Sequence, residues 1–272
     1  MKHTRLPLIA AQLGVAALIA SIGIAAPAYA DSETSQLVAN PTRYIDHSGV
    51  VHYQFDPVEL PGAIVRVDAG TSTDGSCQFT GTGSGSAKDA PTIEVGSELT
   101  FDPATCTRQI AVGKYELSNA PASVLATLNI PKGMITDSVI DTAASAQAAL
   151  SNWYGMMNAR VQDPIGIHVS ETEAEHTWNS GGVVSHHNRW GWYSPTGWSR
   201  TSSSTLNTSI ATNTRGTFQN IIFCNPFAAT YTNHSRTEFR GYTSGLWDWC
   251  YTMSKSGDCA ELLSYHYSVI AP

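Results

Sequence analysis

The stretch Leu246-Trp247-Asp248-Trp249-Cys250-Tyr251-Thr252-Met253 indicates the class of fold. Trp247 and Trp249 are two residues apart, so a strand would place both rings on one face. The next four residues, 254–257, predict a hairpin turn, and residues 261–270 predict a returning strand. This end of the chain therefore indicates antiparallel β structure.

Short segments of the same kind recur upstream and are separated by Gly, Ser, Asn and Pro. They predict strands over residues 50–55, 63–67, 92–95, 99–101, 165–169, 189–193, 216–223 and 239–242. The glycine-rich run Gly81-Thr82-Gly83-Ser84-Gly85-Ser86 lacks the third glycine and the following helix of a phosphate-binding loop, so it predicts a flexible hairpin turn. So many short strands favour an antiparallel β-sandwich.

One segment has a helical rather than a strand period. Thr136 and Asp137 are suitable caps, and apolar residues then recur every three or four positions, at Ile140, Ala144, Leu150, Tyr154 and Met157. Asp163-Pro164 ends the pattern, because the residue before a proline is disfavoured in a helix. The fold class that we expect is mainly β, with an antiparallel sandwich and one connecting amphipathic helix.

The predicted organisation has four parts. They are a signal peptide (1–30), an N-terminal β-rich region (31–118), a linker with the helix (119–160) and a C-terminal aromatic-rich β domain (161–272). Whether the two β regions form separate domains or share one core is left open by the sequence.

The first thirty residues have the features of a secretory leader. Lys2 and Arg5 precede an apolar, alanine-rich run over residues 6–26, and Ala28-Tyr29-Ala30 has a cleavage pattern. A retained membrane anchor is the alternative, but the apolar run ends at Pro27 and a cleavage motif. No second run is long enough to span a bilayer. We therefore expect a secreted, extracellular protein with no membrane span after cleavage.

The charge of the chain argues against nucleic acid as a partner. Removal of Lys2 and Arg5 with the leader takes the formal net charge from −7 to −9. Residues 31–177 hold 18 acids against 7 Lys or Arg, whereas residues 178–272 hold 4 acids against 6 bases. Neither part is basic enough to form an electrostatic surface for a phosphate backbone.

Five cysteines follow the leader, where thiols normally oxidise. Cys77 and Cys106 are alone in their half, so their pairing is expected. Cys224 with Cys259 is the favoured second pair, which leaves Cys250 free, but Cys250 with Cys259 across a hairpin is a close alternative. An odd cysteine is either a buried free thiol or the site of an intermolecular bridge.

Paired aromatic residues provide the main indication of a binding function. Six of the seven tryptophans lie between residues 178 and 249. Exposed ring pairs stack on the flat faces of sugars, and nearby amide, guanidinium and carboxylate groups bind sugar hydroxyls. The predicted ligand-binding set is Trp190, Trp192, Trp247, Trp249, Asn188, Arg189 and Asp248. The competing interpretation is that these rings fill the core.

Histidines and glutamates suggest a hydrolase as the alternative function. Three glutamates, at 171, 173 and 175, lie between His168 and His176, and His186 and His187 follow. A metal site needs three or four such ligands to converge, and the chain has no His-Glu-x-x-His motif. Gly241–Gly245 has Thr where a nucleophile elbow has Ser. We therefore predict no catalytic residue, no metal and no cofactor.

The function that the sequence favours is that of a non-catalytic binding protein for carbohydrate or cell-wall material. A secreted hydrolase with a His or carboxylate site is one alternative. The other is an envelope-associated structural protein or inhibitor with a protein partner, for which Cys250 would allow disulfide-linked dimers.

Several short motifs in residues 150–272 carry a resemblance. They are Trp153-Tyr154, Asp163-Pro164-Ile165-Gly166-Ile167, Thr196-Gly197-Trp198, Phe223-Cys224 and Gly257-Asp258-Cys259-Ala260-Glu261-Leu262-Leu263. Together they resemble a group of exported β-rich proteins of Gram-positive filamentous soil bacteria. Members of that group often carry a Cys where Gly182-Val183 stands here, which would account for the odd cysteine count. The resemblance implies a fold and export, and no particular activity.

Overall fold

The computed structural model describes residues 42–45, 51–55, 58–73, 75–142, 151–225 and 228–272. The predicted leader, 1–30, lies outside these residues. The described residues belong to one compact unit of antiparallel strands, which confirms the predicted mainly β, sandwich-like class of fold.

The strands form two sheets, each of them antiparallel throughout. Sheet A contains, in spatial order, β1 (Thr42–Ile45), β2 (Val51–Gln54), β6 (Thr92–Asp102), β16 (Ser264–Ala271), β9 (Trp153–Gln162), β10 (His168–Asn179), β11 (Gly182–Trp192) and β8 (Ile135–Thr142), with β7 (Thr107–Glu116) beside β6 and β3 (Ile64–Ala69) beside β7. Sheet B contains β12 (Trp198–Thr205), β13 (Ala211–Asn225), β14 (Ala228–Gly241), β15 (Leu246–Gly257), β5 (Ser76–Ser86) and β4 (Thr71–Thr73).

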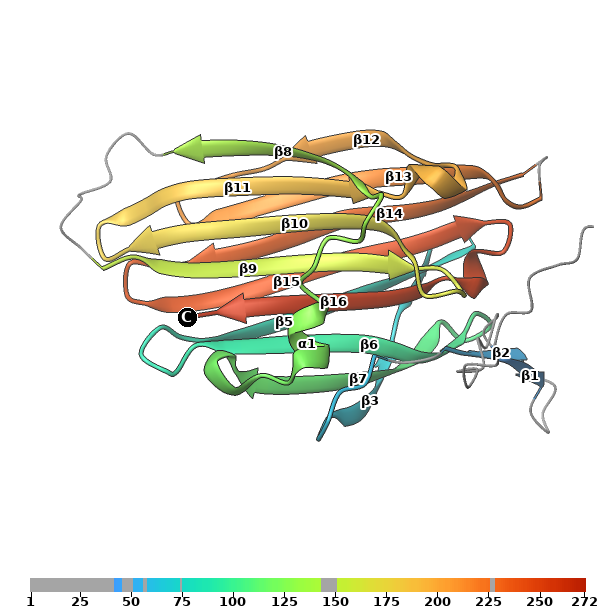
Figure 1. Ribbon diagram of the computed structural model, residues 1–272, viewed down its shortest axis with the longest axis horizontal. Coiled ribbons are helices and arrows are strands. Elements are labelled where there is room, and N and C mark those ends of the chain that lie inside the picture. Colours follow the sequence, from blue (N-terminus) through green and yellow to red (C-terminus); the bar gives the residue numbers. More distant parts are fainter. Residues whose placement is uncertain (1–41, 46–50, 56–57, 74, 143–150, 226–227) are drawn as a thin grey trace, which may run out of the picture. The chain divides into compact units, whose positions relative to one another are not determined.

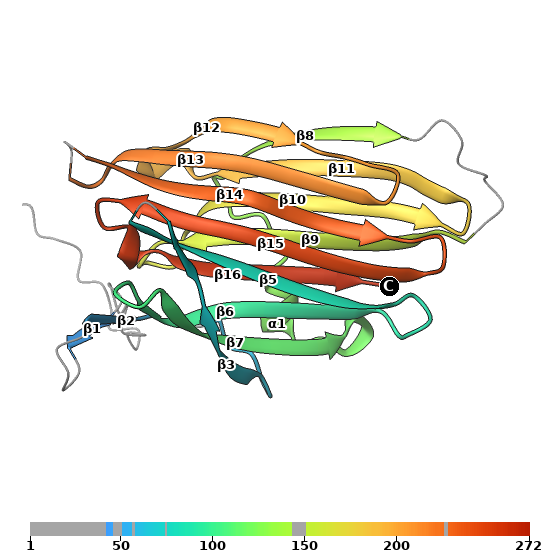
Figure 2. The same ribbon diagram turned by 180° about the vertical axis from the view of Figure 1, so that it is seen from behind.

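The two sheets lie face to face as a sandwich (Figures 1 and 2). Strands from the N-terminal and C-terminal regions lie in both sheets, since β5 pairs with β15 in sheet B and β6 pairs with β16 in sheet A. The side chains between the sheets form one large apolar cluster. The two β regions that the sequence left open therefore share one core.

The glycine-rich run 81–86 is a strand, and the predicted turn is wrong. Gly81, Gly83 and Gly85 of β5 lie directly opposite Tyr251, Trp249 and Trp247 of β15. A Cβ atom at Gly83 would lie 2.6 Å from the Trp249 indole, so the ring occupies the space of the missing side chain. Because every second residue of β5 is a glycine, the aromatic rings of β15 can lie against the inner face of β5. The turn predicted at 254–257 is likewise the end of β15, and the chain reverses after it through the 3-10 turn Ala260–Leu262.

The helix predicted from Thr136 to Met157 is also wrong. Residues 135–142 form β8 and residues 153–162 form β9, while residues 143–150 lie outside the described part. β9 lies between β10 and β16, and most of its residues are buried on both faces. A strand buried on both faces carries apolar residues without alternation, so its pattern is compatible with a helical period.

The described α-helix is α1 (Ala122–Ala126), which lies on the outer face of sheet A (Figure 1). Its Val124 is fully buried in a second apolar cluster with Ile93 and Val95. The chain then crosses the outer face of sheet A as a strap, residues 127–134, to reach β8 (Figure 1). Met134 in this strap covers Gly191 of β11, where a Cβ atom would lie 2.6 Å from the Met134 sulfur.

Both predicted disulfides are present. Cys77 in β5 pairs with Cys106 in the β6–β7 turn, with 5.3 Å between their Cα atoms, and this bond ties sheet B to sheet A. Cys224 pairs with Cys259, and Cys250 is free and buried. Two disulfides indicate folding in an oxidising compartment. Within the described ranges, no helix combines the length and hydropathy needed to cross a bilayer.

Candidate functional site: a groove at the end of the sandwich

The predicted tryptophan platform is not an exposed surface. Trp190, Trp247 and Trp249 are 3%, 5% and 2% exposed and belong to the core between the sheets. Trp192 is half-buried against the same core. The Arg200 guanidinium lies over the rings of Trp190 and Trp192, with its carbon 5.3 and 5.0 Å from their centroids. Each pair shares a face as predicted, but that face is the inner one.

The polar residues predicted to accompany these rings lie in three different places. Asn188 is fully buried between the sheets, where its amide donates to the Thr214 hydroxyl at 2.8 Å. Arg189 lies on the outer face of sheet A and forms a bidentate pair with Glu173, at 2.8 and 2.6 Å. Asp248 lies on the other sheet, in β15, and accepts from the Tyr242 hydroxyl at 2.7 Å. The predicted ligand-binding set therefore does not converge on one surface.

The histidines of the hydrolase alternative are also divided. The rings of His176 and His186 lie side by side inside the sandwich at a tilt of 41°, with 5.3 Å between their centroids, and both contact the Thr212 hydroxyl. Burial lowers the pKa of His176 to about 3 and also lowers that of His186. His187 lies on the outer face of sheet A, and His168 lies at the opposite end of β10. The described residues contain no cluster of three or more ligands suited to a metal ion.

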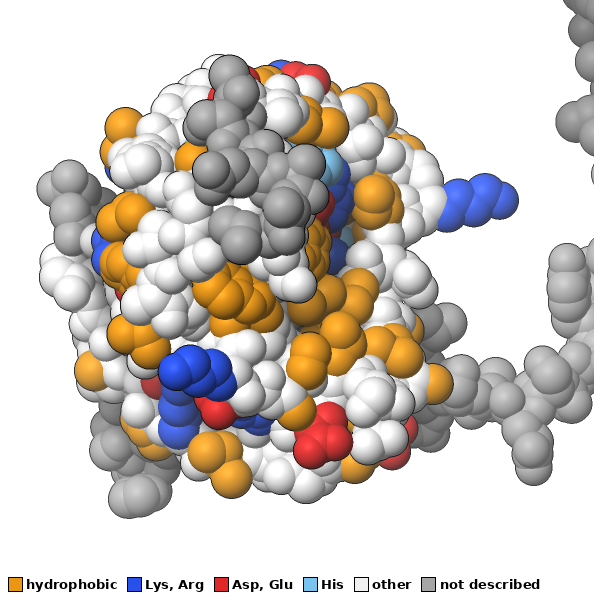
Figure 3. Space-filling view, turned by 90° about the vertical axis from the view of Figure 1, so that its left-hand side faces the viewer, with side chains coloured by type: hydrophobic (Ala, Val, Ile, Leu, Met, Phe, Trp, Pro, Cys, Tyr) orange, Lys and Arg blue, Asp and Glu red, His pale blue; other side chains and the backbone are white. Residues whose placement is uncertain are grey.

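A groove of about 400 Å³ opens at the end of the sandwich where β9 begins and β16 ends. Its walls come from the β5–β6 turn, the start of the 3-10 turn after β7, the first residues of β9 and the end of β16. They are Ala87, Asp89, Pro91, Leu117, Asn152, Trp153, Tyr154, Ile270, Ala271 and Pro272. Figure 3 looks onto this end, where hydrophobic side chains gather near the middle of the surface.

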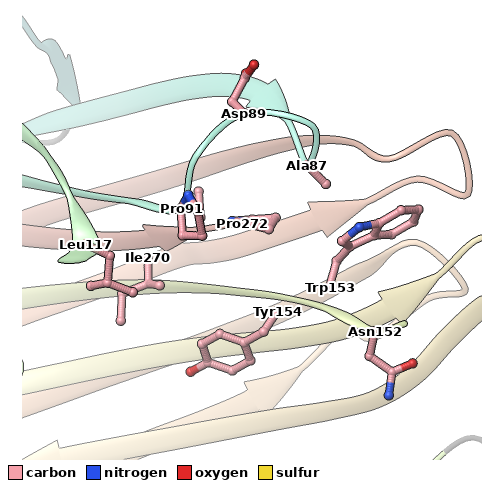
Figure 4. A pocket seen from close by; sticks show the side chains of 10 residues that line it. Ala87, Asp89, Pro91, Leu117, Asn152, Trp153, Tyr154, Ile270 and Pro272 are labelled. Carbon is pink, nitrogen blue, oxygen red and sulfur yellow. The ribbon is translucent and has the colours of Figure 1, made fainter. Parts of the chain in front are cut away.

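Two aromatic side chains of the groove come from adjacent positions of β9. Successive residues of a strand point to opposite sides, so Trp153 and Tyr154 leave the strand in different directions (Figure 4). Trp153 is half-buried, with its ring 5.9 Å from that of Trp178 at the margin of the core. Tyr154 is 39% exposed. Pro91, Leu117 and Ile270 gather on the other side of the groove (Figure 4).

Backbone hydrogen bonds hold the rim of the groove in place. The Ala87 amide donates to the Gly245 carbonyl at 2.7 Å, and the Leu117 amide donates to the Pro91 carbonyl at 2.8 Å. The side-chain oxygen of Asn152 accepts from Asn179 at 3.0 Å, which orients its amide. Asn152 and the exposed Asp89 are the polar side chains of the groove.

A row of charged groups on the outer face of sheet A continues from Tyr154. Burial, followed by the charges of Glu175 and Glu173, raises the pKa of the Tyr154 phenol. Burial and the neighbouring Glu173 also raise the pKa of Glu175, which contacts His187 Nδ1 at 2.8 Å. The pKa of Glu173 is lowered, because Arg189 and Asn158 hold its charged form against the opposing effect of burial. Of the two neighbouring carboxyl groups Glu173 and Glu175, Glu175 is therefore the one that protonates first.

Sequence reasoning could not have located this groove. In the sequence, Trp153 and Tyr154 belong to a resemblance, and Tyr154 also belongs to the apolar pattern of the predicted helix. Neither pattern indicates a binding site, because one aromatic dipeptide does not show which side of a strand faces solvent. Asp89 and Leu117 are distant from them in sequence, and only the sheet order brings all four together. No protein family, curated protein or solved structure matches the chain.

Proposed function

We propose that this protein is an exported, non-catalytic binding protein and that the groove at Trp153 and Tyr154 binds a carbohydrate or cell-wall glycan. The signal peptide predicted at residues 1–30 supports export. The two disulfides are consistent with an extracellular setting. The residues proposed to contact the glycan are therefore different from the buried tryptophans that the sequence suggested.

The observation that carries the proposal is the composition of the groove. Tyr154, which is 39% exposed, the half-buried Trp153 and the polar side chains of Asn152 and Asp89 line one groove of about 400 Å³. A binding site for a small molecule is generally concave and largely apolar, with a few polar groups that fix orientation. Sugars need such a mixture, because their C–H faces pack on rings while their hydroxyls need donors and acceptors.

The contacts of each residue assign it a role. Tyr154 offers a ring face at the mouth of the groove, and its raised pKa keeps the phenol protonated, so the hydroxyl remains a donor. Asn152, oriented by Asn179, and Asp89 supply an amide and a carboxylate for ligand hydroxyls. Trp153 forms the inner wall against the core.

The test is binding of the purified protein to a panel of soluble glycans and insoluble polysaccharides, read by pull-down and tryptophan fluorescence. Replacement of Tyr154 by Ala is expected to weaken binding about tenfold, which corresponds to about 1.4 kcal/mol for one lost ring contact. Tyr231→Ala is the matched control, because Tyr231 is 37% exposed but belongs to β14 of sheet B, where it pairs with Ser256. Absence of saturable binding across the panel, or equal loss in both variants, would contradict the proposal.

The second candidate function is hydrolysis of the bound glycan, and the Glu175 environment favours it. A carboxyl group with a raised pKa next to a histidine can act as an acid or base. This candidate predicts release of new reducing ends from a bound polysaccharide, and loss of that release but not of binding in Glu175→Gln. If the wild-type protein releases no reducing ends from any polysaccharide that it binds, the candidate is excluded.

A further inference from the structure

A small, partly open cavity lies on the outer face of sheet A, next to the first residue of the strap. It measures about 10 Å³, which is room for one water molecule or one monatomic ion. The residues around it are Val58, Val95, Thr127, Arg160, His168, His266, Tyr267 and Ser268. None of them lines the groove at Trp153.

The polar atoms around the cavity are mainly able to donate. Among the described residues, no hydrogen-bond partner is present for Arg160 Nη1 and Nη2, His168 Nδ1, His266 Nδ1 or Ser268 Oγ. Arg160, His266 and Ser268 are 2%, 5% and 1% exposed, so these atoms are withdrawn from solvent. His266 uses its other ring nitrogen toward the Ser264 hydroxyl at 2.9 Å, which leaves Nδ1 for the cavity. Each of these groups can direct a hydrogen toward one central acceptor.

The charge of Arg160 is only partly compensated. Its Nε lies 2.6 Å from Glu171 Oε2, but the other oxygen of Glu171 lies 2.6 Å from Arg189 Nη1. One carboxylate is thus shared between two guanidinium groups, and within the part of the chain that the structure describes the two Nη atoms of Arg160 have no hydrogen-bond partner. Among the described residues, the side chains that line the cavity include no carboxylate.

The two imidazoles respond to this positive field. Burial, followed by the charge of Arg160, lowers the pKa of His168 to about 4. Burial lowers the pKa of His266 to about 3, and the field of Arg160, Arg108 and Lys255 acts in the same direction. Both rings are therefore neutral N–H donors near neutral pH, in surroundings that favour a negative charge.

We propose that this cavity is a halide site that binds one chloride ion through Arg160, His168, His266 and Ser268. A water molecule accepts at most two hydrogen bonds, so it leaves part of this donor set unpaired and the charge of Arg160 uncompensated. A chloride ion accepts from all four side chains and also neutralises the free end of Arg160. A space of about 10 Å³ favours a monatomic ion over a larger oxyanion such as phosphate or sulfate.

The first test is unfolding of the purified protein at constant ionic strength while sodium gluconate is replaced by sodium chloride or bromide. A ligand that binds only the folded state lowers the unfolding constant by the factor 1 + [L]/Kd, about elevenfold at ten times Kd. We expect a saturable rise in stability with both halides. An equal response to gluconate and chloride would overturn the proposal.

Ser268→Val tests the location, because it removes a donor and adds a methyl group where the ion would sit. The halide-dependent rise should disappear in this variant and persist in the control Ser254→Val, which lies on β15 of the other sheet. Crystals of the wild-type protein grown in bromide supply a measurement that does not depend on the variant folding. An anomalous peak between Arg160 and Ser268 supports the site, and a cavity that holds water only overturns it.

Discussion

The space between the two sheets contains two different kinds of interior. In the aromatic half, between β5 and β15 on one side and β6 and β16 on the other, rings pack on rings. The rings of Trp249 and Tyr251 are nearly parallel at 6.1 Å, and Tyr251 lies 5.1 Å from Tyr267. In the hydroxyl half, between β10 and β14, side chains of Ser, Thr and His meet across the sheets.

The hydroxyl half is connected by short hydrogen bonds around one histidine. The two ring nitrogens of His234 contact Ser170 at 3.1 Å and Thr172 at 2.9 Å. Ser170 also contacts Thr232 at 2.7 Å, and Thr172 contacts Thr237 at 2.6 Å. All five side chains are fully buried, and each bond joins sheet A to sheet B.

The difference shows that one sandwich can be closed by two kinds of physical interaction. Packing of rings is non-directional and depends on volume, so the aromatic half should be sensitive to added atoms. Buried hydrogen bonds depend on protonation and on the presence of both partners, so the hydroxyl half should respond to pH and to unpaired deletions.

The largest effect is expected from a side chain added to the aromatic half. Gly83→Val would place a Cβ atom 2.6 Å from the Trp249 ring, which is 2% exposed and cannot move into solvent. We expect a loss of about 3 kcal/mol in the free energy of unfolding, the upper part of the range for overpacking. Urea denaturation of the purified variant measures it.

Thr82→Val is the matched control for this prediction. Thr82 is the neighbour of Gly83 in β5, but its side chain is exposed on the outer face of sheet B. Valine is favourable on an exposed strand, so the stability should change by less than about 0.5 kcal/mol. Comparable losses in both variants would mean that Trp249 does not occupy the space over Gly83.

The same glycines show how much of the fold was predictable. The β class followed from strand-like segments, and the Cys77–Cys106 bond followed from the isolation of these two cysteines in one half of the chain. Cys224–Cys259 was favoured in the sequence, but Cys250 with Cys259 was a close alternative that the structure excludes. The strand character of Gly81–Ser86 did not follow from a local signal, because glycine has low strand propensity and the rings that require it, on β15, are about 170 residues away in sequence. The helix predicted over 136–157 failed for a related reason, since only the pairing of β9 with two neighbours buries both of its faces.

The candidate site was less predictable than the fold. A spacing of two places Trp247 and Trp249 on one face, but it cannot tell whether that face meets solvent or another sheet. Whether these rings are buried depends on the sheet that packs against that face, and the residues around Trp247 and Trp249 do not indicate that sheet. The groove at Trp153 consists of turns and strand ends from four distant segments, so no motif could identify it.

The second prediction concerns acid stability of the hydroxyl half. Burial lowers the pKa of His234 to about 3, against an ordinary value of 6.5. Between these values the unfolded chain binds a proton that the folded protein does not, so stability falls as pH decreases below 6.5. One such histidine contributes a slope of up to about 1.4 kcal/mol per pH unit. His234→Gln should therefore flatten the dependence of unfolding free energy on pH between 4 and 6 by about that amount.

A substitution in the aromatic half provides the comparison. Tyr251→Phe removes the hydrogen bond that joins Tyr251 to Arg108 at 2.7 Å. Burial raises the pKa of Tyr251, so this phenol does not titrate between pH 4 and 6. The variant should be less stable at every pH in this range, with the slope of the wild-type protein. A flattened slope in Tyr251→Phe, or an unchanged slope in His234→Gln, would contradict the assignment of acid sensitivity to the hydroxyl half.

The smallest effect is expected where both partners of one buried hydrogen bond are replaced together. Thr237→Val removes the hydroxyl that Thr172 contacts at 2.6 Å, and Thr172→Val removes the other partner. Each single variant leaves a buried polar group short of a partner and should cost about 1–2 kcal/mol. The double variant should cost less than the sum of the two, with a coupling energy of about 1 kcal/mol in a double-mutant cycle.

The coupling should be incomplete, because Thr172 also contacts His234 and its loss affects that ring in either background. Strict additivity would show that the two hydroxyls do not bond to each other, and the hydroxyl half would then be held together by His234 rather than by contacts between neighbouring threonines.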